Sequence, residues 1–290
     1  MKILTVRHAT TYRYKRPVTF GQHRLMLRPR DSHDLRLVSA ELTLSPPGPV
    51  RWMHDVFGNS VALVDFQGAA DTLSIVSNLK IERYGLEGLR FPIAPEAEFY
   101  PFIYSSSDRV DLGRLLEQHY PDPEGVLARW ADGFVTARPL PTLDLLKAMN
   151  AALQPHIVYA ERHELGTQSP AETLQKKSGA CRDFAMVFIE AARYLGFGAR
   201  FVSGYLYDPA LDKGEATPAT AATHAWAEVY LPGAGWIEYD PTDVLIGGEA
   251  LIRVAVTRDP SQAVPITGKY IGSEDDFDSM NVEVTVTAQG

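Results

Sequence analysis

The sequence predicts an α+β protein in which an antiparallel β domain is followed by a core of helices and strands. Three observations support this prediction. Residues 1–100 contain short β-type runs separated by turn residues, residues 101–195 carry apolar residues at helical spacing, and residues 199–240 return to strand patterns. We therefore expect a β-rich N-terminal domain over residues 1–100 and a second domain over residues 101–290, with a helical lead-in and a C-terminal strand.

The N-terminal domain is predicted from five apolar runs bounded by turn residues. Leu35 and Leu37, and again Leu42 and Leu44, show the two-residue period of a strand with one buried face. A proline-rich segment, RFPIAPEAEFYPF, marks the boundary region between the two domains. The five runs are ILTVRHATTYRY, HRLMLRP, LRLVSAELTLSP, SVALVDFQG and TLSIVSNLKIERY.

Helical patterns follow the boundary in DLGRLLEQHY, PEGVLARWADGF and TLDLLKAMNAAL. Ser169, Pro170 and Glu172 then have the residue types of an N-cap, a first helical position and a capping-box acid, which predicts a short helix. A longer helix with one buried stripe is expected from Cys181 to a stop at Gly196. The stripe consists of Phe184, Val187, Phe188, Ala191, Ala192 and Leu195.

Strand patterns return in ARFVSGYLY, THAWAEVYL and GWIEYDP. The second and third of these runs flank Pro232-Gly233-Ala234-Gly235, which predicts an antiparallel hairpin. The tail SMNVEVTVTA alternates valine with polar residues and predicts one more strand, which we assign to the second domain.

The composition argues against a nucleic-acid or membrane partner. The chain has 28 Lys plus Arg against 36 Asp plus Glu, a formal net charge of -8, so a broad attraction to anionic surfaces is not expected. We interpret Arg24, Arg28, Arg30 and Arg36 as solvated charges on strand edges. No run approaches the ~20 apolar residues of a membrane span, and the first residues hold too few apolar side chains for a signal peptide. We expect a soluble, cytoplasmic protein, and the sequence leaves its oligomeric state open.

Cys181 is the single cysteine, so it forms no intrachain disulfide, and the histidines show no zinc-ligand spacing. The sulfur is therefore either structural or reactive. Its place at a predicted helix start favours a thiolate, and the unpaired N–H groups there can face an oxyanion. Arg182 would favour the thiolate and Asp183 would disfavour it. Which of these two effects is larger depends on the directions of the two side chains.

A nucleophilic cysteine needs a base, and the base needs a third group that orients it. His224 opens the first strand of the predicted hairpin and Asp240 closes the second, so both lie at the same end of the sheet. A four-residue loop would place Asp240 opposite Ala227, so contact with His224 requires a tighter loop or a bend. Each of the three residues alone has an ordinary structural interpretation, and their combination in this order favours catalysis.

Three further residues are weaker candidates for lining the site. Trp226 shares the strand face of His224 and is either a site residue or a core tryptophan. Gln168 could donate to an oxyanion, although as a loop residue it is expected to be exposed. Tyr205 is expected to be packing more than catalytic, and the loop DPALDKGEATPATAAT is a candidate for shaping an acceptor cleft.

Two long segments, GACRDFAMVFIEAARYLGFGARFVSGYL and THAWAEVYLPGAGWIEYDPT, resemble the core of the transglutaminase-like superfamily, in the bacterial branch described as cysteine proteases. TYRYKRPVTFGQHRLMLRPR and HDVFGNSVALVDF resemble the β-rich N-terminal domain that accompanies that core. The resemblance implies a papain-like core in which the helix bearing the cysteine packs on an antiparallel sheet. It also implies a catalytic triad, with Cys181 from G-x-C, His224 from H-A-W and Asp240 from D-P-T.

The resemblance implies thiol-dependent acyl transfer on amide bonds, with hydrolysis of a peptide or carboxamide as the leading expectation. Transglutaminase-type amine transfer or peptide ligation is the first alternative, and a non-catalytic binding or scaffold protein is the second. The animal enzymes have G-Q-C-W at the nucleophile, whereas Ala180 and Arg182 flank Cys181 here. For that reason their calcium dependence is not carried over, and no metal or cofactor is expected.

Overall fold

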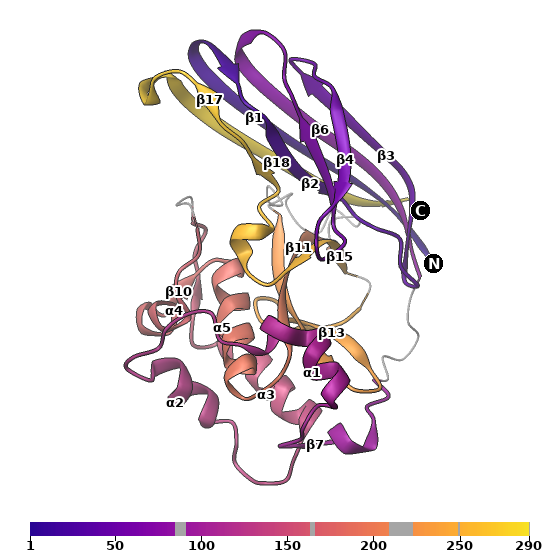
Figure 1. Ribbon diagram of the computed structural model, residues 1–290, viewed down its shortest axis with the longest axis vertical. Helices are drawn as coiled ribbons and strands as arrows, with labels where there is room; N and C mark the ends of the chain where they lie inside the picture. The colour runs from indigo at the N-terminus through magenta and orange to yellow at the C-terminus, as the bar shows by residue number, and fades with distance from the viewer. Residues whose placement is uncertain (85–90, 163–165, 209–222, 249, 290) are drawn as a thin grey trace.

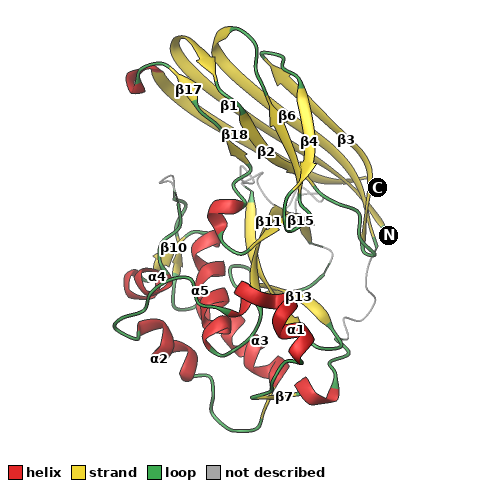
Figure 2. Cartoon of the chain, viewed as in Figure 1, coloured by secondary structure: helices red, strands yellow, loops and turns green. Residues whose placement is uncertain are grey.

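The computed structural model describes residues 1–84, 91–162, 166–208, 223–248 and 250–289. The molecule has two parts. Figure 1 shows a β-rich upper part that contains both marked chain ends and a lower part with the helices and a second sheet. Figure 2 shows that the helices α1 to α5 all lie in the lower part. The predicted α+β architecture, with a β-rich N-terminal region and a mixed core, is confirmed.

The N-terminal part is a sandwich of two antiparallel sheets that share one apolar core, with residues such as Phe20, Leu25, Val64 and Ile75 drawn from both sheets. One sheet contains β17 (Tyr270–Ile271), β18 (Phe277–Gln289), β1 (Lys2–Phe20), β6 (Ala69–Arg83) and β3 (Leu35–Ser45). The other contains β16 (Ile266–Thr267), β2 (His23–Arg28), β5 (Ser60–Val64) and β4 (Val50–His54).

Two features of this sandwich differ from the sequence prediction. The strand β4 was not predicted, because all five of its residues are exposed and it lacks an apolar alternation. The predicted C-terminal strand is present as β18, but it pairs with β1 in the N-terminal sheet, from Ile3 with Gln289 to Tyr14 with Phe277. Assignment of that strand to the second domain was wrong, since its partner lies at the opposite end of the sequence.

The core contains a five-stranded antiparallel sheet in the order β14, β13, β12, β11, β15. The strands β12 and β13 form the predicted hairpin, and β14 and β15 were not predicted. The strands are β11 (Ala199–Leu206), β12 (His224–Leu231), β13 (Gly235–Asp240), β14 (Leu245–Ile246) and β15 (Leu251–Thr257). Two small pairs add β7 (Phe99–Tyr100) with β8 (Leu140–Pro141), and β9 (Val158–Tyr159) parallel to β10 (Ser178–Gly179).

The helical lead-in contains α1 (Ser106–Leu112), α2 (Val126–Asp132), α3 (Thr142–Leu153) and α4 (Pro170–Lys176), and the long helix is α5 (Cys181–Tyr194). The run DLGRLLEQHY, predicted as a helix, contributes only its first two residues to α1, because the chain then turns into a 3-10 segment and residues 117–120 are not helical. Short 3-10 turns occur at η1 (Pro95–Ala97), η2 (Gly113–Leu116), η3 (Pro260–Gln262) and η4 (Glu274–Asp276). The expected cap of α4 is present, since the Ser169 hydroxyl accepts the N–H of Glu172 at 3.2 Å. Over the ranges that the structure describes, no helix is long and apolar enough to span a bilayer.

The helix α5 is the centre of the core and is more buried than its single predicted stripe indicates. Residues Asp183 to Arg193 are all buried, because α2, α3 and α4 surround the helix and the sheet packs against it through Ala225, Ala227 and Val229. Two of the three buried charged residues of this stretch form an ion pair, with Glu190 Oε1 2.7 Å from Arg193 Nη1. Burial on all sides fixes the position of the helix, and with it the position of Cys181.

The N-terminal sandwich is attached to the core sheet by apolar and polar contacts. Tyr205, Tyr207 and Ile252 of the core pack in one cluster with Leu4 and Val286 of the sandwich. The turn after β4 docks on β15, where the Asn59 amide nitrogen donates to the Val256 carbonyl at 2.7 Å and the Val256 N–H donates to the Asn59 side-chain oxygen at 2.9 Å. The two parts therefore share a specific interface.

Candidate active site

Cys181 is the first residue of α5, and its side chain is partly exposed at the N-terminal end of the helix. Asp183 and Phe184 donate their N–H groups to the carbonyl of Ala180, whereas no described residue accepts the N–H of Cys181. The helix start thus presents partial positive charge and an unused backbone donor beside the sulfur. Both features favour negative charge on the sulfur and on a nearby oxyanion.

The start of α5 is fixed by the buried carboxylate of Asp183. Its Oδ2 accepts the N–H of Ala180 at 2.9 Å, and its Oδ1 accepts the N–H of Gln168 at 2.8 Å. The guanidinium of Arg162 lies 2.9 Å from both carboxylate oxygens. Asp183 was expected to disfavour a thiolate, but its charge is matched by Arg162, and its role in the structure is to hold the residues before the helix in place.

Arg182 and Gln168 lie beside Cys181 with their donors directed at backbone carbonyls. Arg182 Nε donates to the Gly166 carbonyl at 2.8 Å, and the Gln168 amide nitrogen donates to the Ser178 carbonyl at 2.9 Å. Gln168 is buried, so the expectation of an exposed loop residue was wrong. Its amide supports the strand before the cysteine and is not presented to an oxyanion.

The hairpin of β12 and β13 has a three-residue turn, from Pro232 to Ala234, and Leu231 pairs with Gly235. If this register is continued to the end of β13, Asp240 lies across from Trp226, on the sheet face that also carries His224. The four-residue loop considered from the sequence would have put Asp240 on the opposite face. One residue of loop length therefore decides whether the aspartate and the histidine can meet.

The two side chains do meet, with His224 Nε2 2.6 Å from Asp240 Oδ2. Both residues are buried. The second carboxylate oxygen, Oδ1, accepts the N–H of Thr242 at 2.9 Å and that of Asp243 at 3.3 Å. With both oxygens engaged, the carboxylate is held in one orientation towards the imidazole ring.

The pKa of His224 depends on both Asp240 and Cys181. Burial alone would lower the pKa of His224, but hydrogen bonds to Asp240 and Cys181, together with the negative charge of each, raise it to about 10. Since Nε2 faces Asp240, Nδ1 is the ring nitrogen that remains for the sulfur. An imidazole with this pKa is protonated at neutral pH, which suits a thiolate–imidazolium pair.

Trp226 and Tyr205, the two aromatic candidates, have different surroundings. Trp226 is fully buried and its ring stacks on His224, with the centroids 6.0 Å apart. Tyr205 follows Gly204, which pairs with His224, so its side chain alternates to the other side of the strand. There its hydroxyl lies 3.1 Å from Nδ1 of His8 in the N-terminal sandwich. Tyr205 belongs to the interface between the two parts and does not line the site, which corrects its place among the candidates.

Two residues near the site were not predicted. Asp243 is half-exposed, and its Oδ2 lies 3.6 Å from His224 Nε2. Tyr159 is half-exposed and paired with Gly179, and partial desolvation together with the negative charges of Cys181 and Glu161 raises the pKa of its hydroxyl to about 12. Asp243 could have been inferred from its position three residues after Asp240, whereas Tyr159 reaches the site through a pairing that no local pattern indicates.

His224, Asp240 and Asp243 also form a set of donors that could hold a metal ion, since their ligand atoms lie within 4.8 Å of one another. A cation there would coordinate the same Nε2 atom that now faces Asp240. Metal binding would therefore compete with the pairing of the histidine and the aspartate.

A helix-start cysteine with a histidine and an aspartate supplied by an adjacent antiparallel hairpin defines a papain-like site on an α+β core. Residues 128–241 match the family model of the transglutaminase-like superfamily, and residues 4–82 match that of the bacterial transglutaminase-like N-terminal region. The chain therefore contains a transglutaminase-like superfamily core preceded by the bacterial transglutaminase-like N-terminal region.

Relatives match over nearly the whole chain. The uncharacterized protein Rv2569c of Mycobacterium tuberculosis is 28% identical over 96% of this chain and 91% of its own length. The uncharacterized protein ML0607 of Mycobacterium leprae is 25% identical over 93% of each. A solved structure from Cytophaga hutchinsonii, described as a "Putative Cysteine Protease", covers 98% of this chain and 90% of its own with a TM-score of 0.67 and 16% identity. This last similarity establishes a shared fold across both parts of the molecule.

Proposed function

We propose that the protein is a cysteine peptidase or amidase that acts through Cys181, His224 and Asp240. The observation that carries the proposal is the 2.6 Å contact between His224 and Asp240 on a ring that also interacts with the helix-start sulfur. The match of residues 128–241 to the transglutaminase-like superfamily supports the same chemistry. The expected substrate is a peptide or another carboxamide.

In the first half-reaction the thiolate of Cys181 attacks the amide carbonyl carbon, and the carbonyl electrons move to oxygen. The backbone N–H of Cys181 stabilises that oxyanion. When the tetrahedral intermediate collapses, the C–N bond breaks and the imidazolium of His224 gives its proton to the departing nitrogen. The products of this step are a free amine or ammonia and a thioester on the enzyme.

In the second half-reaction water attacks the thioester. Neutral His224 takes the water proton, the C–S bond breaks, and the carboxylic acid product leaves while the thiolate and imidazolium are restored. Asp240 orients the ring and stabilises its positive charge throughout, without moving a proton itself.

The test is alkylation of the full-length protein with iodoacetamide at about pH 6, where a free thiol with a pKa of ~8.5 is almost entirely protonated. The expected result is one added carbamidomethyl group, because the chain has a single cysteine. The variant His224→Ala should lose this reactivity, and the surface variant Arg36→Gln should keep it. An inert thiol in the folded wild-type protein would overturn the proposal and favour a non-catalytic binding protein.

A second candidate is amine transfer, in which a primary amine replaces water at the thioester. The half-exposed Asp243 carboxylate beside His224 favours it, because it would attract an ammonium group to the site. A glutamine peptide incubated with and without a labelled primary amine distinguishes the two. Incorporation of the label supports transfer, whereas release of ammonia with no incorporation supports hydrolysis.

A further inference from the structure

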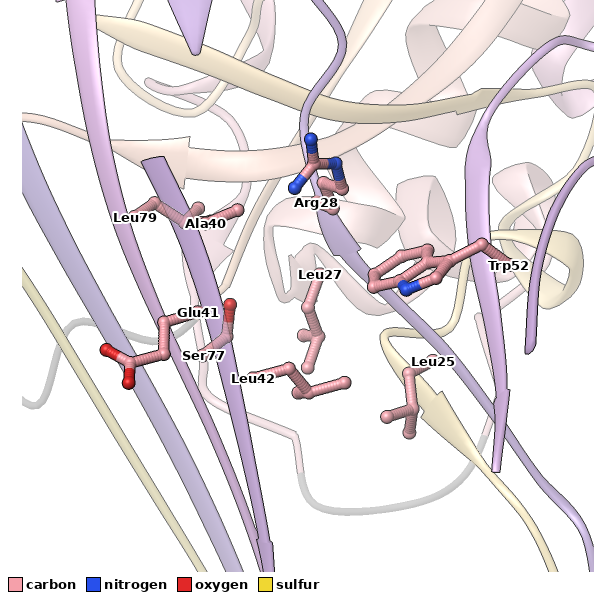
Figure 3. Close-up of a pocket in the computed structure, with 9 residues that line it drawn as sticks. All are labelled: Leu25, Leu27, Arg28, Ala40, Glu41, Leu42, Trp52, Ser77 and Leu79. Carbon is pink, nitrogen blue, oxygen red and sulfur yellow. The ribbon is translucent and has the colours of Figure 1, made fainter. Parts of the chain in front are cut away.

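A groove opens on the N-terminal sandwich, away from the residues of the candidate active site. Figure 3 shows its inner wall, where Leu25, Leu27 and Leu42 point towards one another beneath Trp52 and Arg28. The outer part has a volume of about 590 Å³. We call it the edge groove and define it by Arg28, Ala40, Leu42, Val50, Trp52 and Met53.

The edge groove lies between the last strands of the two sheets. Over the described parts of the chain, β3 pairs with β6 alone and β4 pairs with β5 alone, so each has an edge on which no other strand is paired. In β4 the Pro49 carbonyl accepts the N–H of Asp65, and Asp55 donates to Asn59. The alternation of an antiparallel ladder then directs the backbone groups of Val50, Trp52 and His54 away from β5, towards the open edge.

Three of the five exposed side chains of β4 are apolar, and the other two are Arg51 and His54. Trp52 is 49% exposed, and Val50 and Met53 are 38% and 42% exposed. Edge strands of soluble proteins are commonly protected by charges, prolines or bulges, and a long apolar edge pairs readily with another chain. This strand therefore has the properties of a recognition edge.

The charge of the edge groove indicates which strand it would accept. Arg28 lies with its guanidinium 5.7 Å from the centre of the Trp52 ring, and among the described residues its side chain has no carboxylate or carbonyl partner. Glu41 is turned away from both side chains in Figure 3. Three nearby arginines have oxygen partners: Arg24 with Gln262 at 3.3 Å, Arg30 with Gly58 at 2.7 Å and Arg36 with Glu82 at 3.5 Å. Arg51, in β4 itself, is exposed and, like Arg28, has no oxygen partner among the described residues.

We propose that the edge groove binds an extended acidic segment of a partner polypeptide, which adds to β4 as a further antiparallel or parallel strand. Main-chain hydrogen bonds to Val50, Trp52 and His54 would supply affinity, as in other cases of strand addition. An apolar side chain of the segment would pack on Trp52 and Leu42, and a carboxylate two positions away would reach Arg28. The interpretation of Arg28 as a solvated edge charge is replaced by a binding role.

The proposal is tested with a fluorescent peptide of about nine residues in which glutamate alternates with valine around a central phenylalanine, titrated with the full-length protein. Trp52→Ala should weaken binding by about tenfold or more, as expected for an aromatic anchor. Arg28→Gln should weaken it by about fivefold and reduce its dependence on salt. The matched control Arg36→Gln should leave the affinity unchanged, and equal binding by all four proteins would overturn the proposal.

Backbone recognition is tested separately. N-methylation of one alternate set of peptide residues should abolish binding, and methylation of the other set should leave it intact, because a strand offers every second N–H to its neighbour. Equal effects of both sets would exclude strand addition. Replacement of the glutamates by lysines should also abolish binding, and retained binding would exclude selection for acidic segments.

A further experiment with lipid vesicles distinguishes a peptide ligand from a lipid surface, since an exposed tryptophan beside arginine also suits a membrane interface. The proposal would be overturned if the wild-type protein sediments with vesicles of anionic phospholipid, Trp52→Ala does not, and the peptide does not bind. Alkylation of Cys181 in Trp52→Ala should match the wild type and show that the variant is folded. Because binding is measured without turnover, the outcome is independent of the proposed enzymatic function.

Discussion

His224 and Asp240 contact each other diagonally across the hairpin, with 2.6 Å between Nε2 and Oδ2, although the register places Asp240 across from Trp226. Diagonal neighbours in a sheet are far enough apart that only longer side chains meet. Trp226 fills the remaining position and stacks on the imidazole ring. The ring is thus held by a carboxylate at one nitrogen and by an indole on its face.

Asp240→Asn should reduce the rate of Cys181-dependent amide hydrolysis by about a hundredfold or more, because the amide cannot stabilise the imidazolium and can fix the wrong tautomer. The Trp226 stack and the hydrogen bonds to Thr242 and Asp243 should keep the fold intact. Measurement of kcat/KM and of the thermal midpoint separates the two effects. A loss of activity that is accompanied by unfolding would point to a structural role instead.

The pH dependence should follow His224, whose pKa is raised to about 10. Its protonated form is required to donate to the leaving nitrogen, so hydrolysis should persist at neutral pH and decline as the pH rises through about 10. The stabilising effect of the ion pair is fully present below ~6.5, the ordinary value for histidine, and is lost as the pH rises towards 10. An alkaline limit near pH 7 in the wild type would contradict this arrangement, and Asp240→Asn should move the limit in that direction.

Arg162→Gln should destabilise the protein by about 3 kcal/mol, because it leaves the buried Asp183 carboxylate without its cation. The matched control is Arg36→Gln, which breaks an exposed ion pair with Glu82 and should cost less than about 1 kcal/mol. Both free energies of unfolding are measured with urea. A double variant, Arg162→Gln with Asp183→Asn, should recover part of the loss, and no recovery would contradict the ion-pair explanation.

Glu238 provides a second pH-dependent prediction. Burial and the negative charge of Glu228 raise the pKa of Glu238 to about 8, against an opposing effect of Arg253. The folded state therefore binds a proton that the unfolded state has released, and the free energy of unfolding should fall as the pH rises from 4.5 to about 8. Trp226 Nε1 donates to Glu238 Oε1 at 3.3 Å, and Glu238→Gln, which can still accept this hydrogen bond, should flatten the decline. An equal decline in the variant would assign it to other groups.

The sequence was most informative where local patterns act. The strands β1, β2, β3, β5 and β6, the helix from Cys181 and the hairpin with His224 and Asp240 were predicted from periodicity and turn residues, because each depends on neighbours in the chain. The resemblance to the transglutaminase-like superfamily was likewise carried by contiguous segments. The prediction that three distant side chains converge became testable once the turn length was known.

The errors concern pairings between distant segments. The partner of β18 is β1, more than 250 residues earlier, and no local pattern specifies that choice. Gln168 is buried with its own donors on Asp183 and on the Ser178 carbonyl, and its residue type does not predict burial. Strand β4 was missed for the opposite reason, since its side chains face solvent and give no alternation.

The position of β18 beside β1 has a consequence for synthesis of the chain. The strand β1 leaves the ribosome well before β18, its neighbour on one side, because the whole core is encoded between them. Until then β1 keeps an unpaired edge, which is a hazard for association with other nascent chains. The sandwich is therefore completed only after the core between its strands has been made, and termination before residue 277 would leave it open.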